Sequence, residues 1–144
     1  MSLVEVLVVI ALIGAMAGLV AMAVGRALPG RQLGNAAKDV AAQLRFTRAL
    51  AIASGETKVF ELDVARKTWS AADRREGTLP DDIDLDITSA REEMPGEDVA
   101  GFRFFPDGAS TGGRIVLRHG DAAWRVDIAW LTGEVTLERG DGTP

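Results

Sequence analysis

The organisation of this chain is decided by residues 2–24, which read SLVEVLVVIALIGAMAGLVAMAV. Every residue in this stretch is apolar or small except Glu5. A helix of about 20 apolar residues is long enough to span the core of a bilayer. An ionised side chain inside such a span costs at least about 2.5 kcal/mol, so it normally has a partner. We therefore expect residues 1–25 to form a membrane-spanning helix in which the carboxylate of Glu5 pairs with an α-amino group.

Other interpretations of this segment are open. A secretory signal peptide needs a basic start, an apolar run of about 7 to 15 residues and a small-residue cleavage site. Here no Lys or Arg precedes Arg26, and the apolar run is longer. A buried core helix of a soluble protein is a second alternative, because Gly14 and Gly18 would allow close helix packing. Glu5 could also be tolerated near the membrane interface by snorkelling, without any partner.

An amphipathic pattern continues the helix over residues 26–54. Apolar or small residues recur there at steps of three and four, which predicts a helix face that packs on a sheet. These residues are Leu33, Ala37, Val40, Leu44, Thr47 and Ala51. The charged residues Lys38, Asp39, Arg45 and Arg48 fall elsewhere on the helix. The pattern indicates that this half of the helix packs against a folded domain and exposes its charges to solvent.

Three positions are expected to weaken the helix. Pro29, followed by Gly30, predicts a kink or a local break near residues 28–31. Gly14 and Gly18 are weak points within the apolar stretch, because glycine is a poor helix former. Ser54-Gly55 is expected to end the helix.

Residues 55–144 have the pattern of a β-rich head domain. Apolar and polar residues alternate over 59–64, and a turn at 65–67 leads into a second segment around Trp69, which predicts a hairpin. Further strands are predicted at 82–88, 101–105, 113–119, 123–130 and 133–138, and residues 89–99 as a connecting loop. Successive strands without an intervening helix favour antiparallel pairing. The predicted class is α+β, a long N-terminal helix packed on an antiparallel sheet or sandwich.

Composition restricts the classes of function. The 144 residues contain no cysteine, which excludes disulfides, thiol nucleophiles and thiolate metal sites. Charge is unevenly distributed along the chain. Residues 1–54 carry five basic and two acidic residues, a net +3, whereas the remainder carries 11 basic and 19 acidic residues, a net −8. An acidic head makes nucleic-acid binding an unfavourable hypothesis.

Catalytic and metal-binding patterns are weak. His119 is the only histidine and is expected at the edge of a turn. Asp107, Ser110 and Thr111 have no evident base near them in sequence. Asp82, Asp84 and Asp86 with Glu93 match the acidic positions of a calcium loop, but Ile87 replaces the glycine that such a loop needs. Trp69, Trp124 and Trp130 are expected to pack in the core. We predict no enzymatic activity, no cofactor and no metal site.

Residues 2–14, SLVEVLVVIALIG, resemble the mature N-terminus of type IV pilins and of type II secretion pseudopilins. This resemblance implies that a prepilin peptidase removes a short basic leader, that Met1 is the N-methylated first residue, and that Glu5 pairs with the N-terminus of a neighbouring subunit in a filament. Met1 stands where the family usually has Phe, so it could also replace the native residue. The family often has a helix breaker near position 22, where this chain has Met22.

A second resemblance involves residues 101–117, GFRFFPDGASTGGRIVL, which are similar to the strand-loop-strand signature of the H-type minor pseudopilin (GspH) family. Its turn residues here are Phe105, Pro106, Asp107, Gly108, Gly112 and Gly113. Residues 130–135, WLTGEV, resemble the final hairpin turn of the same family. Both segments also contain ordinary turn chemistry, a fixed φ at Pro106 and a permissive Gly108.

These resemblances imply a structural subunit near the tip of a type II secretion pseudopilus, which links the shaft of major pseudopilin to a tip complex for export across the outer membrane. They imply one inner-membrane span with a periplasmic head. The implied partners are major and minor pseudopilins, the prepilin peptidase and the inner-membrane assembly platform. A minor pilin of a type IV pilus is one alternative. A single-span anchored periplasmic binding module is another.

Overall fold

The computed structural model describes residues 2–89 and 98–141, and within helix α1 it leaves the side chains of residues 23–29 undescribed. The predicted loop at 89–99 lies mostly outside these residues. The chain forms two compact units, Met1–Arg31 and Gln32–Pro144, and helix α1, Leu3–Ser54, contributes to both.

The first unit contains the apolar part of α1. Leu3–Met22 is long and apolar enough to cross a membrane, with a mean hydropathy of 2.7. Its side chains are exposed, and nothing lies within 4 Å of a Cβ built on Gly14 or Gly18. The helix is continuous through Pro29 and Gly30, so a local break there is not found. A kink at Pro29 and weak points at Gly14 and Gly18 stay predictions.

In the second unit, α1 buries the predicted face of its amphipathic half. Leu33, Ala37, Val40, Leu44, Thr47 and Ala51 are all buried, which confirms the pattern read from their spacing. The hydroxyl of Thr47 donates to the carbonyl oxygen of Gln43 at 2.8 Å, which satisfies its polar group inside the core.

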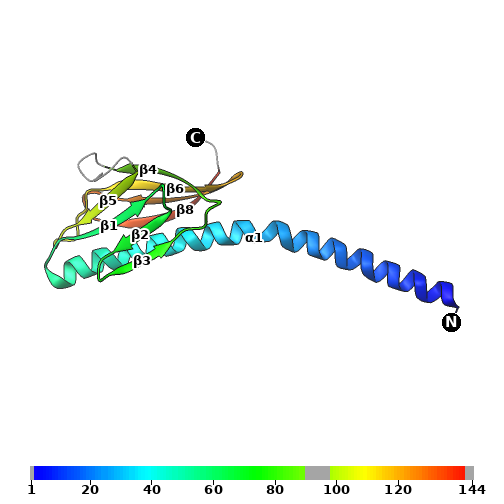
Figure 1. The fold of residues 1–144 in the computed structure, drawn as a ribbon. Coiled ribbons are helices and arrows are strands. Elements are labelled where there is room, and N and C mark those ends of the chain that lie inside the picture. Colours follow the sequence, from blue (N-terminus) through cyan, green and yellow to red (C-terminus); the bar gives the residue numbers. More distant parts are fainter. Residues whose placement is uncertain (1, 90–97, 142–144) are drawn as a thin grey trace. The chain divides into compact units, whose positions relative to one another are not determined.

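Two four-stranded antiparallel sheets complete the second unit (Figure 1). The first sheet has the order β3-β2-β1-β5, formed by Arg75–Thr78, Thr68–Ala71, Lys58–Asp63 and Val99–Phe104. The second sheet has the order β4-β6-β7-β8, formed by Asp84–Ser89, Gly113–His119, Ala122–Ile128 and Val135–Asp141. One hydrophobic core joins residues from α1 and from both sheets. The predicted α+β class, a helix packed on antiparallel sheets, is confirmed.

Strand β3 is a correction to the predicted strands, because nothing was predicted at Arg75–Thr78. Asp73 and Arg74 adopt positive φ of 62° and 57° and turn the chain back. Gly77 pairs with Trp69, whose ring would lie 2.5 Å from a Cβ at position 77. The guanidinium of Arg75 stacks 3.9 Å from the ring centroid of Phe46 on α1. This strand therefore depends on the tight turn from β2 and on one distant partner, Phe46 of α1.

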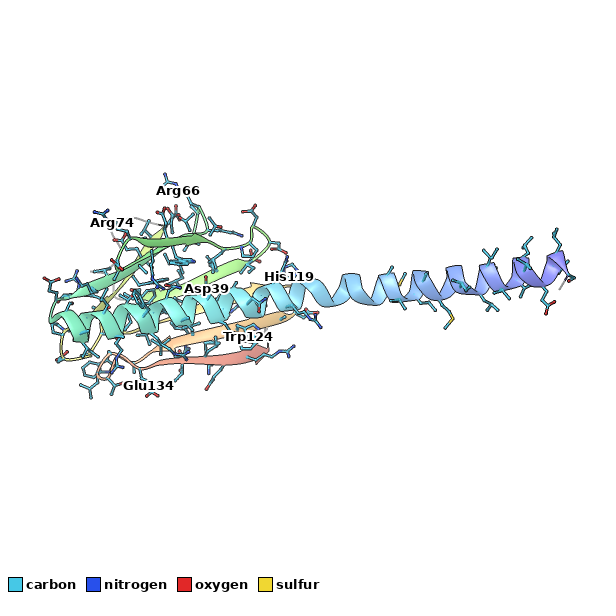
Figure 2. The ribbon with its side chains drawn as sticks, turned by 90° about the horizontal axis from the view of Figure 1, so that it is seen from below. Asp39, Arg66, Arg74, His119, Trp124 and Glu134 are labelled. Atoms are coloured by element: carbon cyan, nitrogen blue, oxygen red, sulfur yellow. The ribbon has the colours of Figure 1, made fainter. Side chains whose placement is uncertain are left out.

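The end of strand β7 is a second correction. The predicted strand 123–130 includes Ala129 and Trp130, but β7 ends at Ile128 and the chain enters a loop. Trp130 was expected in the core, yet 69% of its surface is exposed. Trp69 is buried, as expected. Trp124, which Figure 2 labels, packs against the core beside Gly34 of α1, also as expected.

Candidate functional site

Glu5 lies in the first turn of α1, and Ser2 caps the N-terminus of this helix by accepting from the Glu5 amide. The Glu5 amide donates to the carbonyl oxygen of Ser2 at 3.1 Å and to the Ser2 hydroxyl at 3.3 Å. Ser2 with Glu5 three residues later is the start of a capping box, a signal that the sequence interpretation overlooked. A carboxylate in the first turn is also favoured by the helix dipole. Ser2 therefore caps the helix through the backbone amide of Glu5, and the position of the carboxylate in the first turn suits the helix dipole.

Met1, the predicted methylated residue, lies outside the described residues. The side chain of Glu5 is exposed. The predicted ion pair between Glu5 and an N-terminus of a neighbouring chain stays a prediction.

The two signature segments of the head fold against each other. We call this arrangement the loop clamp, formed by residues 105–112 between β5 and β6 and residues 129–134 between β7 and β8. The amide of Ser110 donates to the Trp130 carbonyl at 2.9 Å, and the Ser110 hydroxyl donates to the Ala129 carbonyl at 3.0 Å. These bonds connect loops that lie about twenty residues apart in sequence, which the two separate motifs could not reveal.

Glycines make the close approach of the two loops feasible. A Cβ at Gly133, where φ is 65°, would lie 2.1 Å from the carbonyl oxygen of Gly108. A Cβ at Gly112, where φ is 71°, would lie 2.8 Å from the Cβ of Trp130. Side chains at these positions would overlap the opposite loop and strain the backbone. Gly133 is not one of the six turn residues predicted from residues 101–117. It nevertheless lies directly against Gly108 in this arrangement.

Two arginines of α1 bind the same region. The Arg48 Nε donates to the Gly108 carbonyl at 3.0 Å, and Arg45 donates to the Val135 carbonyl from Nε at 3.2 Å and from Nη2 at 2.9 Å. The sequence placed both arginines on a solvated helix face, because helical periodicity carries no information about carbonyls 60 and 90 residues away. These hydrogen bonds fix the loop clamp to the C-terminal part of α1. Figure 2 labels Glu134, a residue of the clamp, beside this part of the helix.

The other signature residues are part of the same turn. The amide of Gly108 donates to the Phe105 carbonyl at 2.9 Å, and the Phe105 amide donates to the Ala109 carbonyl at 2.9 Å. Pro106 lies between them in the turn and is exposed. Gly113, at the start of β6, has φ 147°, and a Cβ built on it would lie 2.6 Å from Phe102 Cε1 and from the Thr88 carbonyl oxygen. Five of the six predicted signature residues thus lie in the β5–β6 connection, and Gly113 is the first residue of β6.

The polar side chains of this loop form hydrogen bonds with backbone amides. Asp107 Oδ1 accepts from the Ala109 amide at 3.0 Å, and Thr111 Oγ1 accepts from the Arg103 amide at 3.1 Å. The hydroxyl of Ser110, which is 5% exposed, also accepts from the Gly112 amide at 3.0 Å. A hydroxyl that is engaged in this way is not positioned as a nucleophile with an adjacent base. The arrangement supports a structural loop and not a catalytic centre.

His119 ends strand β6, as its sequence context predicted. Its Nδ1 lies 2.8 Å from the carbonyl oxygen of Asp82 and 3.4 Å from the carboxylate Oδ2 of the same residue. Asp86 faces Arg118 at 3.7 Å. Within residues 2–89 and 98–141, no three acidic or histidine side chains gather in a way that could hold a metal ion. Glu93, the last position of the calcium-loop pattern, lies outside these residues.

Ion pairs on the surface of the head shift two pKa values. The hydrogen bond and the charge of Lys58, whose Nζ lies 2.7 Å from Glu56 Oε2, lower the pKa of Glu56. A hydrogen bond to Glu138 and the charges of Asp127 and Glu138 raise the pKa of Arg125. Both residues are on the surface, and such shifts are typical of solvated ion pairs and not of a reactive site.

Comparison with known proteins agrees with this structural interpretation. The profile of the family described as "Type II transport protein GspH" matches residues 36–133. A type II secretion system protein H from Xanthomonas campestris pv. campestris is 46% identical over 134 residues, covering 93% of this chain and 79% of that protein.

Two solved structures share the fold. The type IV minor pilin FimU of Pseudomonas aeruginosa matches with a TM-score of 0.59 and 16% identity, over 75% of this chain and 89% of that one. The minor pseudopilin EpsH of the Vibrio cholerae type II secretion system matches with a TM-score of 0.58 and 17% identity, over 78% and 99%. At these identities the structural matches establish a pilin-like fold. The relationship to a protein family rests on the two sequence matches.

Proposed function

This chain belongs to the GspH family of type II transport proteins, and we propose that it is the subunit that links the shaft of a pseudopilus to its tip. As a member of this family it is a minor pseudopilin of type II secretion, a structural subunit and not an enzyme, which interacts with other pseudopilins. A minor pilin of a type IV pilus is the weaker alternative, because the 46% identical relative is a type II secretion protein.

Membrane anchoring follows from the apolar half of α1. We propose that residues 1–25 form the membrane-spanning part in the inner membrane, that 26–54 form its amphipathic continuation, and that 55–144 form a periplasmic head. The segment Leu3–Met22 supports this arrangement, since its length and hydropathy suit a bilayer core. The buried stripe of the amphipathic half supports a junction with the head.

Processing and assembly partners are part of the proposal. A prepilin peptidase would expose and methylate Met1, and an inner-membrane platform would insert the subunit into the growing pseudopilus. Both suggestions rest on the resemblance of residues 2–14 to pilin N-termini.

The observation that carries the proposal is one carboxylate in an apolar stretch. Glu5 is the only charged residue among residues 2–24, and its side chain is exposed in the isolated chain. In a membrane this exposed carboxylate would need a cation, and the α-amino group of a neighbouring subunit is one that assembly brings close. Glu5 would then set the register of the subunit in the filament.

The test is the variant Glu5→Ala in the native host, with secretion and co-purification of sibling pseudopilins as readouts. We expect both to be lost while the protein stays in the membrane fraction. Retention of both would favour an anchored periplasmic binding module instead.

A further inference from the structure

The head has a small apolar surface that lies outside its hydrophobic core. Among the described residues from Gln32 onward, the large apolar side chains that are exposed are Ile52, Trp130 and Leu131, at 46%, 69% and 68%. A Cβ at Gly108 would lie 3.3 Å from Ile52 Cδ1, and Gly108 itself touches the loop that carries Trp130 and Leu131. The three side chains therefore border one feature, the loop clamp. We call them the apolar tip.

The loop under the apolar tip is built to hold its position. The amide of Gly133 donates to the Ala129 carbonyl at 2.7 Å, and the Ala129 amide donates to the Glu134 carbonyl at 2.9 Å, which closes the loop. The Ser110 amide fixes the carbonyl of Trp130 from the opposite loop at 2.9 Å. Trp130 is thus presented on a constrained backbone. A pre-positioned aromatic side chain loses little conformational entropy on binding, and tryptophan is enriched at interface hot spots.

The charges next to the apolar tip indicate what kind of surface it fits. Asp107 and Glu134, one in each loop of the clamp, are exposed carboxylates. Arg48 is engaged with the Gly108 carbonyl, and Lys58 is paired with Glu56. A partner with apolar side chains bordered by basic residues would complement this surface.

The chain itself shows a segment with that chemistry. Leu19 and Met22 are exposed on α1, and Arg31, also exposed, follows Met22 by about two and a half helical turns. From this complementarity we infer that the apolar tip docks onto the apolar and basic helical stem of a neighbouring pilin-like subunit in the assembled filament. This inference rests on the proposed place in a pseudopilus, and names the face that would make one of its contacts.

Site-specific photocrosslinking tests the contact in native membranes that contain the sibling subunits. The full chain carries p-benzoylphenylalanine in place of Trp130, and the matched control carries it in place of Thr136, an exposed residue of β8. We expect adducts at least fivefold more abundant from position 130, with the crosslinked peptide in an apolar helix that is followed by basic residues. Equal yields from the two positions, adducts with lipid, or adducts with the head of another subunit would overturn the inference.

Two variants test the chemistry of the contact. The double variant Trp130→Ala with Leu131→Ala should lower the recovery of sibling subunits at least fivefold without changing the thermal unfolding of the head, because both side chains are exposed. Glu134→Lys should lower the adduct yield, whereas Glu76→Lys on exposed β3 should not. Unchanged recovery in the double variant while the wild-type chain still co-purifies with pseudopilins overturns the contact alone. Failure of the wild-type chain to co-purify contradicts the proposed function.

Discussion

The apolar half of α1 and the head satisfy their apolar surfaces in different ways. Residues Leu3–Met22 expose their large apolar side chains throughout, so their environment must come from a bilayer or from other helices. The head buries most of its large apolar residues in one core of α1 and two sheets, and its own hydrogen bonds fix its two signature loops. The apolar half of α1 therefore needs external partners to cover its apolar side chains, whereas the head covers most of its own. Substitutions in each region test that distinction.

Leu44→Ala and Leu12→Ala make the same change in the two regions. Leu44 is fully buried in the head, so its truncation should lower the free energy of unfolding by about 2–5 kcal/mol. Leu12 is exposed, so its truncation should change that free energy by less than about 0.5 kcal/mol. Thermal unfolding of the detergent-solubilised chain, followed by the fluorescence of Trp69 and Trp124, measures both. Similar losses in the two variants would show that the halves do not differ as described.

Gly133→Ala and Gly120→Ala separate steric overlap from backbone strain. Both glycines have positive φ, 65° and 57°, but only the new Cβ at position 133 meets other atoms, the Gly108 carbonyl oxygen at 2.1 Å and Arg48 Nε at 2.9 Å. We expect Gly120→Ala to cost about 1 kcal/mol of unfolding free energy. Gly133→Ala should cost at least about 2 kcal/mol more, because the loop clamp must open. Equal costs would mean that the two loops are not in close contact.

Arg48→Met removes the hydrogen bond from α1 to the loop clamp and keeps much of the side-chain length. Because Arg48 is only partly buried, we expect a loss of about 1 kcal/mol in the free energy of unfolding. Arg139→Met, at an exposed position of β8, is the control and should be close to neutral. An Arg48 variant as stable as the Arg139 variant would argue against the helix-to-loop contact.

Lys58→Met should have the smallest effect, one on titration. Lys58 lowers the pKa of Glu56, so the ion pair stabilises the head above the ordinary pKa of a carboxyl group and this contribution is lost as the pH falls through the lowered value. In the variant, the pKa of Glu56 should rise toward its ordinary range. Titration of the Glu56 carboxyl carbon by NMR measures the change, and an unaltered pKa would contradict the pairing.

Local patterns in the sequence predicted the parts of the fold that depend on spacing. The buried stripe from Leu33 to Ala51 follows from helical periodicity, and strand β6 was predicted with its observed bounds. Turn residues around Pro106 likewise marked the β5–β6 connection. Each of these features depends on residues that are close together in the chain.

Features that depend on distant partners were missed. The Arg75 guanidinium of strand β3 lies over the Phe46 ring of α1, and the Arg48 Nε donates to a carbonyl 60 residues away. Trp130 was predicted as part of the strand 123–130. It lies instead in the loop of residues 129–134, where its side chain is exposed. The helix cap formed by Ser2 is different, because its local sequence pattern could have been recognised and was overlooked.

The most direct test of the central claim compares Glu5→Gln with Ser2→Ala for co-purification of the major pseudopilin from membranes. Gln keeps the shape of the side chain and removes its charge, whereas Ser2→Ala keeps the charge and removes the hydroxyl that caps the helix. If the carboxylate of Glu5 pairs with a neighbouring subunit, Glu5→Gln should lose the major pseudopilin and Ser2→Ala should retain it. Retention by Glu5→Gln, or an equal loss in both variants, would contradict the account.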